Sequence, residues 1–273
     1  MFGYRQLRVA ILLGATLAAL NATSRAAEPD DPWPGLVQDI FNNRQMNDGA
    51  EVVGIEMPYR AEDAAIVPVT LRTKLSPDDS RRVKAITLVI DQNPAPMAAR
   101  FELGGEARVT EISTRVRVNS YTNVHAVAEL DDGQLYVAKT YVKASGGCSA
   151  PAAKNPEEAK NRLGQIRYRQ FARPDQGPSS TREAQIMIGH PNNSGLQMDQ
   201  LTQLYIPAFF INELHLWQDN SLVLSMEGGI SISEDPNIRF TYVSNGAKLF
   251  RAEAKDTEGH VFQKSWRVDD PGT

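Results

Sequence analysis

From residue 51 onward the chain alternates apolar and polar residues in short runs, and turn-forming residues separate these runs. Seven runs lie in the first half: Glu51–Met57, Ile66–Lys74, Val83–Asp91, Ala98–Leu103, Arg108–Arg117, Thr122–Glu129 and Gln134–Val142. Alternation of this kind is typical of β-strands that bury one face. Because no long helical pattern intervenes, we expect an antiparallel sandwich of immunoglobulin type.

The same pattern returns in the second half of the chain. The runs there are Glu183–Gly189, Ala208–Gln218, Ser221–Met226, Ile230–Ser233, Ile238–Val243, Lys248–Asp256 and His260–Val268. The turn sequences Asp132-Gly133, Asp219-Asn220 and Thr257–Gly259 predict hairpins, because their residues tolerate the backbone of tight turns. The predicted fold class is therefore all-β, with two immunoglobulin-like antiparallel β-sandwiches.

Helical spacing appears near the start of this region and again between the two halves. Leu36, Val37, Ile40 and Phe41 recur at helical spacing, which predicts a short helix over Gly35–Arg44, packed on a sheet. Residues 149–181 are polar and rich in proline and predict a linker, with a helix over 156–163 and a strand or docking segment over 164–171. We therefore expect a first sandwich over residues 32–148 and a second over 182–270.

Residues 1–26 have the pattern of an export signal. Arg5 and Arg8 precede an apolar run of twelve residues, Val9–Leu20, and Ser24 and Ala26 are small residues suited to cleavage. This run is shorter than the roughly 20 residues of a membrane span, which makes an uncleaved anchor the weaker alternative. We expect a periplasmic protein with a cleaved signal peptide and no membrane span in its mature part.

Charge narrows the class of partner. The formal charge of the chain is −4, and removal of residues 1–26 takes away three arginines and no acidic residue, which moves it to −7. An acidic surface without basic runs argues against nucleic-acid binding. An apolar fraction of 41% and a charged fraction of 23% are those of an ordinary globular protein.

Sequence motifs for catalysis or metal binding are not evident. The four histidines, His125, His190, His215 and His260, are widely separated, and only one cysteine exists, so no ligand spacing for a metal is formed. A catalytic pair of the cysteine with one histidine stays open, because such partners meet in space. We expect no metal, no cofactor and no catalytic residue of the protein's own, which favours a non-enzymatic function.

The single cysteine, Cys148, is the most informative residue. It follows the predicted strand Gln134–Val142 and two glycines, Gly146 and Gly147, which free the backbone. We therefore expect an arm that displays the thiol and that, if extended from Ala144, spans roughly 17 Å. Exported proteins normally pair their cysteines, so an odd one indicates a reactive thiol or an intermolecular disulfide. An incidental cysteine is the alternative.

These features resemble a known family. The segment from Val52 to Cys148 is similar to SoxY, the sulfur-carrying subunit of the SoxYZ complex of periplasmic thiosulfate oxidation. The similar motifs are Ile66–Thr70, Val83–Ile86, Asp91–Pro94, Ser113–Arg117, Ala126–Glu129, Asp132-Gly133 and the closing Gly146–Cys148. The segment from about Arg182 to Val268 resembles SoxZ, with His190-Pro191, Ile211-Asn212 and Gly228-Gly229 in similar places.

The resemblance implies a sulfur carrier. It implies two packed immunoglobulin-like sandwiches, a covalent carrier residue at Cys148 and a carrier arm at Gly146 and Gly147. In SoxY the arm ends the chain, whereas here Ser149 and the residues after it continue into the second half. The chain is thus similar to fused SoxYZ-like carriers associated with periplasmic quinoprotein dehydrogenases, and the implied partners are redox or sulfur-transfer enzymes of the periplasm.

Two functions stay open at this point. The first is a thiol carrier that holds a sulfur species or another small adduct on Cys148 and presents it to partner enzymes. The second is a non-catalytic binding or accessory subunit of a periplasmic dehydrogenase system, in which the cysteine is incidental or forms a dimer. The position of Cys148 on a glycine arm favours the first.

Overall fold

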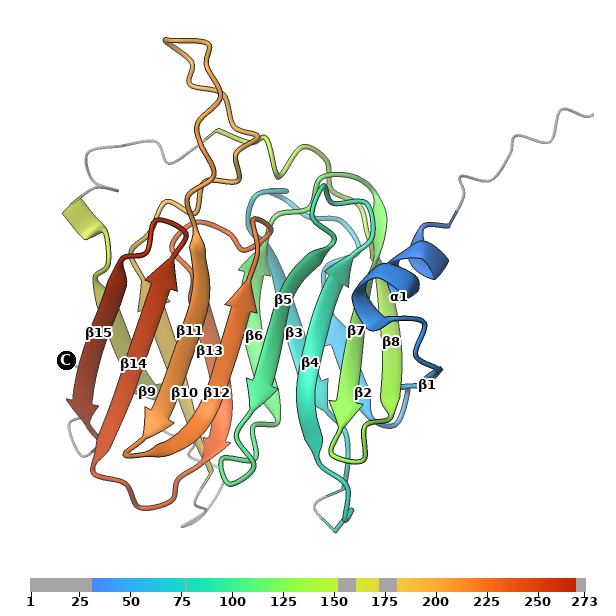
Figure 1. The fold of residues 1–273 in the computed structure, drawn as a ribbon, viewed down its shortest axis with the longest axis vertical. Coiled ribbons are helices and arrows are strands. Elements are labelled where there is room, and N and C mark those ends of the chain that lie inside the picture. Colours follow the sequence, from blue (N-terminus) through green and yellow to red (C-terminus); the bar gives the residue numbers. More distant parts are fainter. Residues whose placement is uncertain (1–30, 77, 152–160, 172–180, 269–273) are drawn as a thin grey trace, which may run out of the picture. The chain divides into compact units, whose positions relative to one another are not determined.

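The computed structural model describes residues 31–76, 78–151, 161–171 and 181–268, and these form one helix and two β-sheets (Figure 1). The helix is α1 (Trp33–Phe41). The strands are β1 (Met46–Asp48), β2 (Val53–Glu56), β3 (Val67–Thr73), β4 (Val83–Ile90), β5 (Met97–Leu103), β6 (Glu111–Val116), β7 (Thr122–Leu130), β8 (Leu135–Val142), β9 (Ile166–Phe171), β10 (Thr181–Ile188), β11 (Ile211–Gln218), β12 (Ser221–Gly228), β13 (Asn237–Val243), β14 (Leu249–Asp256) and β15 (Val261–Arg267).

The two sheets have different widths and enclose one apolar core. The wider sheet has the order β1-β8-β7-β4-β5-β12-β11-β14-β15, and the narrower one has the order β2-β3-β6-β13-β10-β9. In Figure 1 the wider sheet lies in front of the narrower one. Inward-facing side chains such as Phe101 and Leu214 meet between the sheets, because alternate residues of each strand point to the same face.

The first and second halves of the chain join at the edges of both sheets. Strand β5 pairs antiparallel with β12 in the wider sheet, and β6 pairs with β13 in the narrower one. Each pairing satisfies backbone groups that would otherwise be exposed at a sheet edge. From Pro32 onward the chain therefore forms one compact unit by its contacts, rather than two separate bodies.

Helix α1 covers the outer face of the wider sheet beside β7 and β8. Phe41 is buried there with Val89, Val127 and Leu135, and these residues form a second, smaller apolar cluster. Asn42 ends the helix in the left-handed conformation, with its backbone N–H bonded to carbonyls of the last turn. The predicted packing of this helix on a sheet is confirmed, with bounds two to three residues earlier than expected.

The predicted fold class is confirmed, since the described residues are mostly strands in two sheets. Of the predicted strands, Ile230–Ser233 is wrong: the Ile232 N–H bonds to Gly229 O within a turn, and only a single bridge to Val116 forms. Strand β1 was missed, because we expected residues 46–49 only to end the helix. It pairs parallel with β8, and a strand of three residues has too little alternation to be recognised.

Some predictions stay untested. The export signal over residues 1–26 and most of the predicted helix over 156–163 lie outside the described residues. The proposed domain bounds also stay predictions. Within the part of the chain that the structure describes, no helix is long and apolar enough to cross a membrane.

The join between the halves supplies a prediction about stability. Gly104 N donates to Val223 O, and a Cβ at Gly104 would lie 1.8 Å from Leu222 O. We expect Gly104→Ala to force β5 and β12 apart and to lower the free energy of unfolding by about 1–3 kcal/mol. Urea denaturation measures this loss. Gly105→Ala is the control, because its Cβ would meet no atom within 4 Å; equal stability of the two variants would contradict the close approach.

Candidate functional site

The Gly146–Cys148 segment folds back onto the protein instead of extending from it. After β8, the Gly146 N–H donates to Asn119 O at 2.8 Å and the Gly147 N–H donates to Val118 O at 3.0 Å. Both acceptors lie just beyond the end of β6, in the narrower sheet. The segment is thus attached by backbone hydrogen bonds to the sheet opposite the one that delivers it.

The two glycines serve different purposes. Gly147 lies so close to its neighbours that a Cβ would be 2.0 Å from Ala64 O and 2.6 Å from Val118 O. Gly146 has open space but a φ of +77°, which residues with a side chain rarely adopt. One glycine therefore permits close packing and the other permits the turn, so both bring Cys148 toward the interior.

Cys148 is fully buried, with 0% of its surface exposed. The expectation of a displayed thiol on an extended arm is wrong for this conformation. From the second half of the chain, the Ser194 hydroxyl donates to the Cys148 carbonyl oxygen at 2.5 Å. The fusion matters here, because residues after the cysteine return to cover it.

Arg117, the residue after β6, lies behind the same segment. Its side chain is 1% exposed, its Nη1 donates to Gly147 O at 3.3 Å, and its Nη2 donates to Asn192 O at 3.4 Å. The guanidinium thus contacts the cysteine segment on one side and the second half of the chain on the other. Burial lowers the pKa of Arg117, while the charges of Glu234, Cys148 and Asp63 oppose this shift.

Burial also controls the reactivity of the thiol. It raises the pKa of Cys148 to about 11, because the thiolate would lose its hydration, and the positive charge of Arg117 offsets only part of this effect. A thiolate is the reactive form in sulfur chemistry. At neutral pH the buried Cys148 is therefore a protonated and unreactive thiol, and its chemistry requires the segment to open.

The structure brings together two of the four histidines. His190 is buried, with its Nε2 3.6 Å from Asp256 Oδ2, and His260 Nδ1 lies 2.8 Å from the same oxygen. Desolvation lowers the pKa of His190. Its Nδ1 accepts a hydrogen bond from the Asn192 N–H, which connects this cluster to the residue whose carbonyl Arg117 contacts.

The remaining histidines lie elsewhere. His125 is buried under α1, where its Nδ1 lies 2.9 Å from Asp91 Oδ1 and its ring stacks on Trp33 with centroids 3.7 Å apart. His215 stacks on Trp217 on the wider sheet. No hydrogen bond or ion pair among the described residues joins a histidine to Cys148. Nor does any cluster of three metal-ligating side chains occur among these residues.

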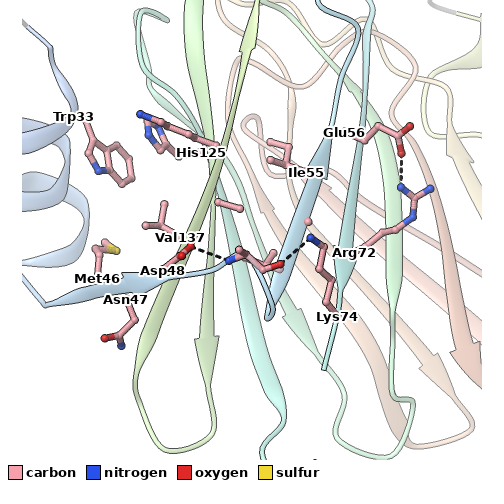
Figure 2. A pocket seen from close by; sticks show the side chains of 15 residues that line it. Trp33, Met46, Asn47, Asp48, Ile55, Glu56, Arg72, Lys74, His125 and Val137 are labelled. Carbon is pink, nitrogen blue, oxygen red and sulfur yellow. Dashed lines mark hydrogen bonds and ion pairs between the residues drawn. The ribbon is translucent and has the colours of Figure 1, made fainter. Parts of the chain in front are cut away.

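The largest cavity, about 790 Å³, is separate from Cys148. Figure 2 shows Trp33 beside His125 on one side of it and the bonded pair Glu56 and Arg72 on the other. Its Lys74 donates to a backbone carbonyl. Two of the cations that line the cavity are thus already partnered within the protein, and the cavity contains no nucleophilic thiol.

Sequence reasoning missed Arg117, Asn192 and Ser194 as neighbours of the cysteine. Arg117 extends the alternating pattern of the strand before it, so the sequence does not distinguish it from an exposed arginine. Asn192 and Ser194 lie more than forty residues from Cys148. The continuation of the chain beyond the cysteine was a signal that later residues could cover it.

Fold and site together define a class of protein: an immunoglobulin-like pair of sheets built from two joined halves, with one cysteine held where the halves meet. Comparison with family models agrees with this division. Residues 37–148 match the model of the sulfur oxidation protein SoxY, and residues 172–267 match that of the sulphur oxidation protein SoxZ. The chain belongs to this family as a fused SoxY–SoxZ-like protein, and the family gives it a general carrier function in sulfur oxidation.

Other comparisons add little. No curated protein matches the sequence. Among solved structures, the superoxide reductase (neelaredoxin) of Ignicoccus hospitalis is 16% identical, covering 34% of this chain and 79% of its own, with a TM-score of 0.30. One single-substitution variant of that reductase gives 16% identity and coverages of 35% and 81%, and another gives 15%, 40% and 90%, both again with a TM-score of 0.30.

The raised pKa of Cys148 predicts a pH dependence of stability. A thiol whose pKa is higher in the folded state contributes stability below its unfolded pKa of about 8.5, and this contribution is lost as the pH rises toward about 11. We expect the wild type to lose stability relative to Cys148→Ala over this range, by at most about 1.4 kcal/mol per pH unit. Denaturation of both proteins at several pH values measures it; parallel curves would contradict a buried thiol.

The close packing of Gly147 predicts that a side chain there exposes the thiol. We expect Gly147→Ala to shift the segment toward an open state and to raise the rate of Cys148 labelling by iodoacetamide about tenfold or more, because a steric cost of about 1.4 kcal/mol changes an equilibrium tenfold. Gly105→Ala is the matched control, in open space away from the site. Labelling of Gly147→Ala at the wild-type rate would show that this contact does not hold the segment.

Proposed function

We propose that this protein is a periplasmic covalent carrier that holds a sulfur species on the thiol of Cys148 and presents it to partner enzymes. The observation that carries the proposal is the extent of the SoxY match, which ends at Cys148, the only cysteine of the chain. The family supports a carrier in general terms, and the position of the match supports Cys148 as the carrier residue. Gly146 and Gly147 are then the hinge of the carrier arm.

The proposed chemistry needs no group besides the thiol. In the open state the Cys148 thiolate attacks an electrophilic sulfur that a partner enzyme supplies, a new S–S bond forms, and the leaving group departs with the electron pair. The proton of the thiol passes to solvent. A partner that attacks the outer sulfur, or oxidises and hydrolyses it, regenerates the carrier.

Burial suits a carrier between enzymes. A closed segment keeps the thiol and its adduct away from water and from other thiols, and reaction happens only after the segment opens. Four contacts hold it closed in the structure: the backbone bonds to Asn119 and Val118, and the side-chain bonds from Arg117 and Ser194. Local opening of such a small element costs much less free energy than global unfolding.

The loop that includes Ser194 offers a contact for partner enzymes. At its base Asn193 and Phe209 pair, and toward its tip Leu201 is 94% exposed and Leu204 and Tyr205 are each 67% exposed. Figure 1 shows this loop, in orange, projecting beyond the ends of the strands. Exposed apolar side chains gathered in one place favour contact with another protein. A partner bound there would lie beside Cys148.

Two parts of the proposal come from the sequence. The pattern over residues 1–26 supports export to the periplasm, where the family's partners act. The association with a quinoprotein dehydrogenase system stays a prediction from the sequence resemblance.

A second function is favoured by one observation. The complete burial of Cys148 is also what an incidental structural cysteine would have, since buried cysteines behave as small apolar residues. The protein would then be a binding or accessory subunit that acts through its sheets and loops. The two functions differ in what happens at the sulfur atom.

The intact mass of the protein purified from its native envelope distinguishes them. We expect a fraction of the molecules to have an added mass of one or more sulfur-containing groups, which maps to Cys148 and disappears after treatment with a reductant. Its size identifies the cargo. The isosteric variant Cys148→Ser is expected to fold, to lack the addition and to lose function in the cell. An unmodified mass in both conditions, together with normal function of Cys148→Ser, would establish the accessory subunit instead.

A further inference from the structure

Arg117 has an unusual electrostatic environment. Exposed arginines of this protein pair with carboxylates, as Arg72 does with Glu56 and Glu111 and Arg81 does with Asp79. Arg117 is 1% exposed, and no carboxylate of the described residues forms an ion pair with it. A buried cation without an anion costs several kcal/mol, so proteins seldom keep one without use.

The hydrogen bonds of Arg117 do not supply the missing negative charge. Its Nη1 and Nη2 contact only the carbonyls of Gly147 and Asn192, at 3.3 and 3.4 Å, and its Nε has no hydrogen-bond partner. Of the five N–H donors of a guanidinium, the one on Nε is therefore unused. Carbonyl dipoles compensate a full positive charge only partly.

A second unused donor lies in the loop that covers the cysteine. Gln197 is 0% exposed, and its Oε1 accepts from the N–H of Ser194, the residue whose hydroxyl bonds to Cys148 O. The Gln197 Nε2 has no partner among the described residues. Two buried donors from different halves of the chain thus lack acceptors near a buried thiol.

We propose that Arg117 is the counter-ion of the carried group, so that the closed site selects an adduct of Cys148 that ends in an anion, such as a sulfonate or a thiosulfonate. This inference rests on the proposed carrier function and adds the charge class of the cargo. In the empty carrier the thiol is neutral and Arg117 is unpaired. In the loaded carrier the anionic end of the adduct supplies the missing charge and accepts the unused hydrogen bonds.

Other charged groups near Arg117 do not remove this need. Asp63 and Glu234 act on the guanidinium over a distance, and both attract it. Asp63 already accepts the Ala65 N–H. Because these carboxylates lie beyond ion-pair distance, an anion bonded to Cys148 itself has the stronger interaction with Arg117.

The consequence is a difference in closure between adducts. A small anionic adduct gains the interaction with Arg117 and keeps the segment closed. A neutral adduct of similar size fills the same space but leaves the cation unpaired. Arg117 is thus a specificity-determining residue that acts on bound cargo.

The test uses two chemical adducts on the purified full-length chain. Tetrathionate converts the Cys148 thiol to a thiosulfonate: the thiolate attacks an inner sulfur, an S–S bond forms, thiosulfate leaves with the electron pair, and the thiol proton passes to solvent. Methyl methanethiosulfonate forms the methyl disulfide in the same way and releases methanesulfinate. The two adducts end in an anionic –SO₃⁻ and a neutral –CH₃, both tetrahedral.

Thermal unfolding of the two adducts gives the first readout. We expect the thiosulfonate form of the wild type to have a Tm about 3 °C or more above that of the methyl disulfide form, because only the anion pairs with Arg117. We expect Arg117→Met to abolish or reverse this difference, and Arg117→Lys, which keeps the charge but loses the fork of donors, to restore part of it.

Several controls separate this role from a structural one. Arg115→Met removes an arginine two residues earlier and is expected to leave the difference between adducts as in the wild type. Replacing a buried unpaired charge with an apolar residue is often neutral or stabilising, so we expect unloaded Arg117→Met to fold. Release of each adduct by dithiothreitol is a second readout: Arg117→Met should accelerate release of the thiosulfonate about tenfold more than release of the methyl group.

Two results would overturn the inference. One is a wild-type thiosulfonate form with a Tm equal to or below that of the methyl disulfide form, a comparison that needs no variant. The other is an Arg117→Met protein in which the two adducts differ as they do in the wild type. Either result leaves the carrier proposal standing, because that proposal depends on the mass found at Cys148 in the native envelope.

Discussion

The pairing of sheet edges between the two halves of the chain is the interaction on which the site depends. Strands β5 and β12, and β6 and β13, continue each sheet from one half into the other. Arg117 follows β6 and contacts Gly147 on one side and Asn192 of the other half on the opposite side. Without the edge pairing, the cysteine segment would keep its backbone bonds to the first half but would lose its cover.

Closure and reactivity oppose each other in this site. Removal from water raises the pKa of Cys148 and suppresses the thiolate, which protects a thiol or an adduct between reactions. Chemistry requires the segment to leave its position, and Gly146 and Gly147 give the backbone the freedom to do so. Because the chain continues beyond Ser149, the segment opens as a loop fixed at both ends, so a partner enzyme has to approach the protein closely.

Much of the fold could be predicted from residue patterns, because alternation reports directly which face of a strand is buried. Strand β7 and the turn at Asp132-Gly133 are examples in which the local signal and the final structure agree. Short elements such as β1 carry too little pattern. The position of the cysteine at the end of a strand was also readable, whereas its burial was not: glycine frees a backbone for exposure and for close packing alike, and only the distances from Gly147 to Ala64 and Val118 distinguish the two.

The sequence by itself determined the fold class, the family resemblance and Cys148 as the residue to examine, because alternation, turn residues and a single cysteine are local properties of the chain. Tertiary structure decided that the two halves share their sheets, that the thiol is enclosed, and that Arg117 stands behind it without a carboxylate. These facts depend on contacts between residues far apart in the chain, such as Ser194 with Cys148. Burial and pairing of a charge are properties of its surroundings, and those form only when distant segments pack together.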